Sequence, residues 1–335
     1  MRFGISLRRR LTNLTSSPHL LELKNMKTYF SGSGGLLSRN KQQVKAVDGV
    51  SFHLKKGETL GIVGESGCGK STMGRTIIQL EKATDGLISF EGEEINQYKG
   101  KQLRGIRQDM QMIFQDPFGS LNPRITVGSM LTEIIKVHKV VPADQSKSYI
   151  LKLLDDVGLQ PDHFWRYPHE FSGGQRQRVS IARALAVKPK LIICDEAVSA
   201  LDVSVQAQVL NLLKRLKSEY ELTYLFISHD LSVVKHISDR VAVMYLGTIV
   251  ELASKDQLYN KPRHPYTEAL FSAIPEVTIN KKKRILLKGD IPSPLNIPSG
   301  CRFHTRCPMA TDYCKAEQPE LREIEPGHFS ACHYS

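Results

Sequence analysis

Four short motifs occur in a fixed order along this 335-residue chain. They are GESGCGKST at 64–72, FSGGQ at 171–175, LIICDE at 191–196 and SHD at 228–230. The first is a glycine-rich loop of the G-x-x-x-x-G-K-[ST] type, which binds the phosphates of a nucleoside triphosphate. A genuine loop of this type follows a strand and opens a helix, so it restricts the chain to an α/β fold with the nucleotide at the strand ends.

The residues of the first motif have separate predicted tasks. A strand at Thr59–Val63 should deliver the loop, and a helix should begin at about Lys70. The glycines let backbone N–H groups approach the phosphates, Lys70 places a charge beside the β and γ oxygens, and Ser71 is positioned to ligate Mg²⁺. A glycine-rich turn before an ordinary helix is the alternative, which the spacing, the lysine and the serine all disfavour. The predicted nucleotide contacts of this loop are Gly64, Glu65, Ser66, Gly67, Cys68, Gly69, Lys70, Ser71 and Thr72.

The third motif predicts the complementary half of the phosphate site. Its apolar residues 191–194 make a buried strand that presents Asp195 to the metal, typically through water. Glu196 comes next and faces the γ-phosphate, where a carboxylate can orient and deprotonate the attacking water. An acidic strand end that merely caps a helix is the alternative.

Size and charge place broad limits on the chain. Its length suits one large α/β domain plus a smaller unit, and no stretch approaches the ~18 to 20 uninterrupted apolar residues that cross a bilayer. The arginine-rich N-terminus lacks the apolar core of a secretory signal, so we predict a cytoplasmic protein. The net charge of +12 permits nucleic acid, acidic lipid or an ATP-rich environment as partners, and alone it decides nothing.

The pattern along the chain predicts three parts. Residues 1–18 read as a basic N-terminal arm, 19–275 as the nucleotide-binding domain with a helical subdomain at about 120–180, and 276–335 as a C-terminal extension. Residues 31–43 suit a loop between two strands. A helix after Asp202 should bury an apolar stripe, and Asp144 should cap a second helix. The stripe comprises Val203, Ala207, Leu210, Leu213 and Leu216.

With the second motif, the sequence closely resembles the ATP-binding subunits of ABC transporters over residues 20 to about 275. FSGGQRQR is similar to the signature motif of that family, with Phe171 in place of the usual leucine. The resemblance implies a RecA-like core, an antiparallel β subdomain and a helical subdomain. It also implies that Ser172, Gly173, Gly174 and Gln175, at a helix beginning near Gln175, bind the γ-phosphate of ATP held on an opposite subunit. Two such subunits would close around two ATP molecules.

Further positions match the family one by one. The resemblance implies that Gln115 in IFQDP senses Mg²⁺ and water, that Asp202 in SALD is the D-loop residue, and that His229 is the switch histidine. Phe30, with Tyr29 as second choice, is the candidate for stacking on adenine. Most relatives have proline after the catalytic glutamate, where this chain has alanine at 197, so the hydrolysis rate is open.

A closer resemblance is to the second ATPase of oligopeptide and dipeptide importers. It rests on RYPHEFSGGQRQR, SALDVSVQAQV, PRHPYTEAL and a C-terminal GDIPSPLNIPSGC. Such relatives bind a [4Fe–4S] cluster in this extension, which implies that role for Cys301, Cys307, Cys314 and Cys332. Zinc is second choice because no cysteine pair is two to four residues apart, and free or disulfide-paired thiols remain open. His304 and His328 are predicted to be surface residues.

The resemblance also implies partners that this chain lacks. These are a partner ATPase, two membrane permease subunits and an extracytoplasmic binding protein, with the chain peripheral on the cytoplasmic face of the membrane and no direct contact with nucleic acid. FGSLNPR at 118–124 is the candidate groove for a permease helix, and a plain surface loop is the alternative. The cargo could be peptides, nickel or metallophore chelates, or glutathione. A soluble ATPase acting on nucleic acid or ribosomes and a redox-sensing regulator are the other classes.

Overall fold

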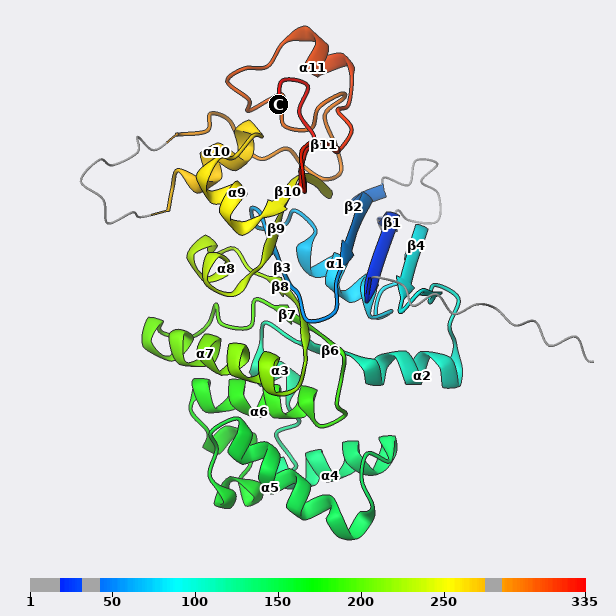
Figure 1. Ribbon diagram of the computed structural model, residues 1–335, viewed down its shortest axis with the longest axis vertical. Coiled ribbons are helices and arrows are strands. Elements are labelled where there is room, and N and C mark those ends of the chain that lie inside the picture. The colour runs from blue at the N-terminus through cyan, green and yellow to red at the C-terminus, as the bar shows by residue number, and fades with distance from the viewer. Residues whose placement is uncertain (1–18, 32–42, 275–284) are drawn as a thin grey trace, which may run out of the picture.

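The computed structural model describes residues 19–31, 43–274 and 285–335 (Figure 1). The predicted basic arm at 1–18, most of the predicted loop at 31–43 and the proposed boundary at 275–276 lie outside the described residues. The division into three parts therefore stays a prediction.

An eight-stranded sheet in the order β11-β12-β10-β9-β3-β8-β7-β6 forms the centre of the molecule. Strands β9, β3, β8, β7 and β6 are parallel, whereas β10, β12 and β11 continue the sheet as antiparallel strands. The parallel strands are covered on both faces, which is why their sequences are nearly continuous apolar runs. The strand bounds are β3 Thr59–Val63, β6 Met110–Ile113, β7 Leu191–Asp195, β8 Thr223–Ile227, β9 Arg240–Tyr245, β10 Thr248–Ser254, β11 Arg322–Glu325 and β12 His328–Ser330.

A smaller antiparallel sheet in the order β2-β1-β4-β5 lies beside the first (Figure 1). Its strands are β1 Leu21–Ser31, β2 Gln43–Leu54, β4 Asp85–Phe90 and β5 Glu93–Glu94. Helix α1, Lys70–Ile77, shares one buried core with both sheets, to which Met26, Ile62 and Met73 belong. The phosphate loop thus sits where the two sheets meet.

The remaining helices cover the main sheet and build the lower part of Figure 1, where α4, α5 and α6 pack together. Helices α4 and α5 and the start of α6 fall within residues 120–180, whose assignment as a helical subdomain stays a prediction. The helix bounds are α2 Gly100–Asp109, α3 Pro117–Ser120, α4 Val127–His138, α5 Ser146–Asp156, α6 Gly173–Leu185, α7 Val203–Glu219, α8 Leu231–Ile237, α9 Lys255–Asn260, α10 Pro265–Phe271 and α11 Asp312–Ala316, with 3-10 turns at Ala143–Gln145, Pro161–Trp165 and Pro168–Glu170.

Two local predictions were wrong. In α7 the apolar stripe begins only at Val209, since Val203 is 82% exposed and Ala207 is also exposed. In the first two turns of this helix, Val205 packs partly against the core, while Val203 and Ala207 lie outside it. Asp144 lies within a separate 3-10 turn, and α5 starts after it without any side-chain cap, so this carboxylate does not cap the helix.

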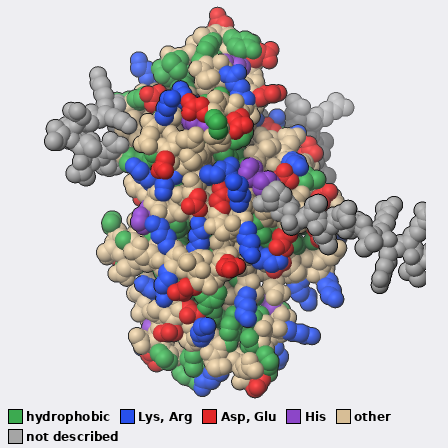
Figure 2. All heavy atoms as spheres, viewed as in Figure 1, with side chains coloured by type: hydrophobic (Ala, Val, Ile, Leu, Met, Phe, Trp, Pro, Cys, Tyr) green, Lys and Arg blue, Asp and Glu red, His purple; other side chains and the backbone are tan. Residues whose placement is uncertain are grey.

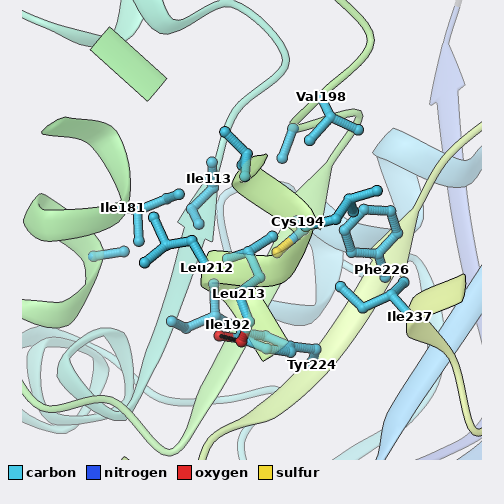
Figure 3. Packing of buried hydrophobic residues seen from close by; sticks show 14 of the residues in the cluster. Ile113, Ile181, Ile192, Cys194, Val198, Leu212, Leu213, Tyr224, Phe226 and Ile237 are labelled. Atoms are coloured by element: carbon cyan, nitrogen blue, oxygen red, sulfur yellow. Dashed lines mark hydrogen bonds between the residues drawn. The ribbon is translucent and has the colours of Figure 1, made fainter. Parts of the chain in front are cut away.

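The core behind β7 fixes the strand that carries the acidic motif. Cys194 packs with Leu213 of α7 and Phe226 of β8 in one buried cluster (Figure 3). Burial raises the pKa of the Cys194 thiol, which keeps it protonated and inert. Fully burying a leucine or phenylalanine contributes about 1.5–3 kcal/mol, so this packing holds the end of β7 firmly in place.

Candidate functional site

The phosphate loop adopts a backbone that requires glycine. Gly64, Gly67 and Gly69 have φ angles of 153°, 77° and 103°. A Cβ on Gly69 would lie 1.9 Å from the Ala46 carbonyl oxygen, and one on Gly64 would lie 2.2 Å from the Met244 carbonyl oxygen. The loop therefore packs closely between β2 and β9, with β3 before it and α1 after it, as predicted from the motif.

Lys70 is buried at the start of α1 and points back over the loop. Its Nζ donates to the Gly64 carbonyl oxygen at 2.8 Å and to the Glu65 carbonyl oxygen at 2.9 Å. No side chain caps the start of this helix at Gly69, so the first backbone N–H groups of α1 have no side-chain acceptor beside the Lys70 ammonium. That arrangement favours an anion such as a phosphate.

Two of the side chains predicted to ligate Mg²⁺ are in contact with each other. The Ser71 hydroxyl donates to Asp195 Oδ1 at 2.7 Å, across 124 residues of sequence. Burial raises the pKa of Asp195, and the hydrogen bond from Ser71 opposes that rise. A divalent cation at this carboxylate would stabilise its ionised form.

Glu196 has the other two predicted catalytic side chains on its carboxylate. Gln115 Nε2 donates to Oε2 at 2.7 Å, and His229 Nδ1 lies 3.1 Å from Oε1. The Glu196 backbone is left-handed, with φ 48°, and its N–H donates to the Ile227 carbonyl. Such a conformation is uncommon for glutamate and is often found at functional sites. The ends of β6, β7 and β8 thus bring together three residues from three motifs.

The signature turn is a helix cap on the surface. Ser172 Oγ accepts from the Gln175 N–H at 3.3 Å, and the Gln175 side-chain oxygen accepts from the Ser172 N–H at 3.1 Å. Helix α6 consequently begins at Gly173, two residues earlier than expected. Gly174 faces α7, where a Cβ would lie 2.5 Å from Val205, so only a glycine fits. In Figure 1 this helix lies well away from α1.

Asp202 caps α7 beside the signature turn. Its carboxylate accepts from the Val205 N–H at 3.0 Å and from the Ser204 hydroxyl at 2.9 Å. The Val205 N–H, followed by the Ser204 hydroxyl, lowers the pKa of this exposed carboxyl group. The predicted D-loop residue therefore has a structural role at this helix start.

Phe30 is the better placed of the two adenine candidates. It is 39% exposed and pairs across the sheet with Val44, two residues before Ala46 in β2. Tyr29, by contrast, donates its hydroxyl to Asp48.

The four C-terminal cysteines, all free thiols, line one small cavity. Burial raises the pKa of Cys301 to about 11, and the same cause raises the pKa of Cys307. The cavity holds about 10 Å³, room for one water molecule. Within the described residues, no three His, Cys, Asp or Glu side chains are grouped so as to hold a metal ion. The donor set suits a metal centre chemically, but its present spacing does not.

His328 corrects a sequence prediction, since it is fully buried and not a surface residue. Its Nε2 lies 2.7 Å from Glu251 Oε1, and Glu251 also accepts from the N–H groups of Arg263 and His264. The reason is that β12 pairs with β10 and turns this side chain into the core. His304 is half-buried, with Nδ1 2.8 Å from the Cys301 carbonyl oxygen.

Sequence reasoning missed three residues that contact the phosphate loop or its neighbours. Arg306 forms an ion pair with Glu65, and Tyr266 accepts a hydrogen bond from the Glu65 N–H at 3.0 Å. Arg302 donates to the Asp48 carboxylate and to the Leu246 carbonyl oxygen. The PRHPYTEAL run contains this tyrosine, but no local spacing relates either arginine to a loop more than 200 residues away.

These features define a P-loop nucleoside triphosphatase with a second glycine-containing helix start on its surface. A family model described as ABC transporter matches residues 47–199, and one described as oligopeptide/dipeptide transporter, C-terminal region, matches 250–314. The oligopeptide transport ATP-binding protein AppF of Bacillus subtilis is 57% identical over 318 residues, covering 94% of this chain and 97% of that protein. The chain belongs to this family of ABC transporter ATP-binding proteins.

Other relatives agree. The oligopeptide transport ATP-binding protein OppF of Escherichia coli is 53% identical, covering 90% of this chain and 92% of that protein. The solved structure of cbiO1 from Clostridium perfringens matches with a TM-score of 0.63 and 25% identity, covering 73% of this chain and 92% of that one. A dimeric structure of the cassette MJ0796 bound to ADP and Pi matches with a TM-score of 0.61 and 28% identity, covering 70% and 98%. No helix in the described part of the chain is long and apolar enough to cross a membrane.

Proposed function

We propose that this chain is the ATP-hydrolysing subunit of a peptide importer. The observation that carries the proposal is the convergence of Gln115 and His229 on the Glu196 carboxylate, near the Ser71–Asp195 pair. Lys70 and the start of α1 would hold the phosphates, and Ser71, Asp195 and Gln115 would face Mg²⁺. Mg²⁺ would neutralise charge on the β and γ oxygens. Phe30 would stack on the adenine ring.

In the hydrolysis step, Glu196 would take a proton from the water that attacks the γ-phosphorus. Its carboxylate is oriented by contacts from both sides, with Gln115 donating to one oxygen and His229 lying against the other. General-base catalysis of this kind contributes about 10²- to 10⁴-fold in rate. A bond from the water oxygen to the γ-phosphorus would form as the bond from that phosphorus to the β–γ bridging oxygen breaks, which releases ADP and inorganic phosphate.

The signature turn would complete the site of a partner ATPase. Ser172 and Gly173 are exposed at a helix start, far from the phosphate loop of the same chain (Figure 1). This placement supports two ATP molecules held between two subunits, and a related cassette has been solved as a dimer with ADP and Pi. Closure would follow ATP binding, and opening would follow hydrolysis.

The remaining partners follow from the same proposal. Two membrane permease subunits would receive the chain at the cytoplasmic face of the membrane, with segment 118–124 between β6 and α4 as the docking groove, and an extracytoplasmic binding protein would deliver cargo. The proposal includes no direct action on nucleic acid. On the face in Figure 2, Lys and Arg are interspersed with Asp and Glu, so this face carries no uniformly basic patch for phosphates.

Cargo is proposed to be dipeptides or oligopeptides, since the names of AppF and OppF refer to oligopeptide transport. The test is uptake by vesicles that contain the chain with its partner ATPase, permeases and binding protein. ATP-dependent accumulation of a labelled tripeptide that excess unlabelled peptide abolishes is the expected result. Uptake of a nickel chelate or of glutathione in its place would contradict the peptide assignment.

We also propose that the four-cysteine cavity takes up a [4Fe–4S] cluster, with zinc as second choice. The proposal is supported by four thiols that line one cavity, and binding would require them to move apart and lose protons. A bound cluster would serve as a structural staple for an extension with little core of its own. Anaerobic purification should give iron and sulfide in equal amounts with visible absorption. Zinc alone, or no metal, would contradict the cluster.

A further inference from the structure

Arg306 of the C-terminal extension contacts the phosphate loop directly. Its Nη1 and Nη2 donate to the two carboxylate oxygens of Glu65 at 2.7 and 3.0 Å. Glu65 is the second residue of the loop that ends in Lys70, whereas Arg306 immediately precedes Cys307. The two partners are 241 residues apart in sequence, so only the folded chain joins them.

Glu65 is fixed by its backbone as well as by its side chain. Its N–H donates to the Tyr266 hydroxyl at 3.0 Å, and its carbonyl oxygen accepts from Lys70 Nζ at 2.9 Å. The position of the Glu65 backbone therefore helps to set the position of the Lys70 ammonium. Tyr266 and Arg306 both belong to the region matched by the oligopeptide/dipeptide transporter C-terminal model.

The Arg306 side chain is only 7% exposed, and the Glu65 side chain is 24% exposed. The Arg306 guanidinium lies 5.9 Å from the centroid of the Tyr245 ring. Phe303, three residues earlier, packs with its ring centroid 5.4 Å from those of Tyr245 and Tyr266. A two-point guanidinium–carboxylate pair in such surroundings is directional and strong.

The charge of Glu65 explains why this pair matters for nucleotide. A carboxylate in the phosphate loop would repel a triphosphate, and the guanidinium both cancels that charge and fixes the direction of the side chain. We propose that Arg306 is a positioning residue for nucleotide binding, which neutralises Glu65 and holds the phosphate loop in its binding conformation. The inference rests on the proposed function, namely ATP binding at this loop.

The test compares variants of the full chain by titration with a fluorescent Mg–ATP analogue. Arg306→Ala should raise the dissociation constant about tenfold, the size of one charge-assisted hydrogen bond. In the assembled transporter the same change should raise KM and leave kcat nearly constant. Adding Glu65→Gln should restore most of the affinity, since it removes the unpaired charge. If Arg306→Ala lowered the nucleotide affinity only by loosening the packing, Glu65→Gln would not restore that affinity, because glutamine fills no more space than glutamate.

Arg263→Ala is the matched control, since it also breaks an arginine–carboxylate pair with the extension, here with Glu325, and no described bond joins the Arg263 side chain to the loop. It should leave nucleotide affinity unchanged. An unaltered dissociation constant for Arg306→Ala, or a double variant as weak as the single one, overturns the inference. If thermal unfolding shows that Arg306→Ala does not fold, Arg306→Lys decides: a single ammonium should cost about threefold, and no change contradicts the proposal.

Failure of this inference is distinguishable from failure of the proposed function. Lys70→Ala serves that purpose in the same titration. If the wild-type chain does not bind the nucleotide, or binds it as well without Lys70, the ATP-binding function itself is wrong. If binding depends on Lys70 but not on Arg306, only the positioning role is wrong.

Discussion

The phosphate loop and the signature turn, the two proposed anion cradles, both lie at helix starts, yet they are built differently. Lys70 and Asp195 are buried and bonded to their neighbours within the chain. Ser172 and Gly173 are exposed, and the serine is held only by its own capping box in the bonds described. The difference indicates that folding assembles the first cradle, whereas the second stays on the surface, as the proposed contact with ATP on another subunit would require.

The largest effect that would test this comparison is expected from Glu196→Gln. Glutamine keeps the shape but cannot accept the proton, so kcat for ATP hydrolysis should fall by about 10²- to 10⁴-fold. Nucleotide should still bind and drive dimerisation, which analytical ultracentrifugation with ATP would measure. The exposed Glu219→Gln change on α7 is the control. Steady hydrolysis near the wild-type rate would remove Glu196 from the catalytic role.

Lys70→Ala should have the next largest effect, on binding instead of turnover. Loss of a buried ammonium that faces the phosphates should raise the nucleotide dissociation constant by about 10²-fold, and it should do so in the isolated chain. Isothermal titration with Mg–ATP measures this change. Lys136→Ala on the surface of α4 is the control. Equal nucleotide affinities for both variants would contradict the assembly of this binding site by folding of the single chain.

Ser172→Ala should separate the two cradles most clearly. Nucleotide binding to the isolated chain should not change, whereas ATPase activity of the assembled dimer should fall by about tenfold. The change also removes a helix cap, which costs about 1 kcal/mol of stability. Ser254→Ala removes an equivalent capping box at α9 and so controls for that loss. Weaker binding in the isolated Ser172→Ala chain would show that the signature turn belongs to its own phosphate loop.

The smallest effect concerns pH at His264, two residues before Tyr266, whose hydroxyl contacts the phosphate loop. Burial lowers the pKa of His264 from 6.5 to about 4, despite the nearby Glu251 carboxylate. Below pH 6.5 this histidine therefore binds a proton in the unfolded chain but stays neutral in the folded chain. The free energy of unfolding consequently falls as the pH falls toward 4. Between pH 7 and 6 the loss should be below about 1 kcal/mol.

His264→Asn isolates this contribution, because asparagine can still accept the Tyr266 N–H bond but does not titrate. Urea unfolding of both proteins at several pH values measures the difference. Parallel curves would contradict the assignment. The lowered pKa values of His53, His163 and His236 act in the same direction in both proteins, so they cancel.

The sequence predicted what is local. The strand, loop and helix around Lys70, and the strand that ends at Asp195, follow from spacing within short segments. The contacts among Gln115, Glu196 and His229 could be expected only through the family resemblance, because each residue follows a different strand. Their roles remain predictions that the variants above would test.

The sequence did not predict contacts that depend on how distant segments pack. The Arg306–Glu65 pair and the buried His328–Glu251 pair join residues 241 and 77 positions apart. The residues around His328 do not indicate that its side chain is buried. Its burial depends on the pairing of β12 with β10, which the local sequence does not predict. The exposed start of α7 escaped prediction for the same reason, because helical spacing defines a face but not how far the core extends along it.

The continuity of the main sheet has a practical consequence. Because β12 pairs with β10, the C-terminal extension completes a sheet that begins in the ATP-binding domain. A chain cut at residue 275 would leave β10 as an open edge and Glu251 buried without its imidazole partner. Exposed strand edges template intermolecular pairing, so such a truncated protein should precipitate instead of yielding a free-standing ATPase.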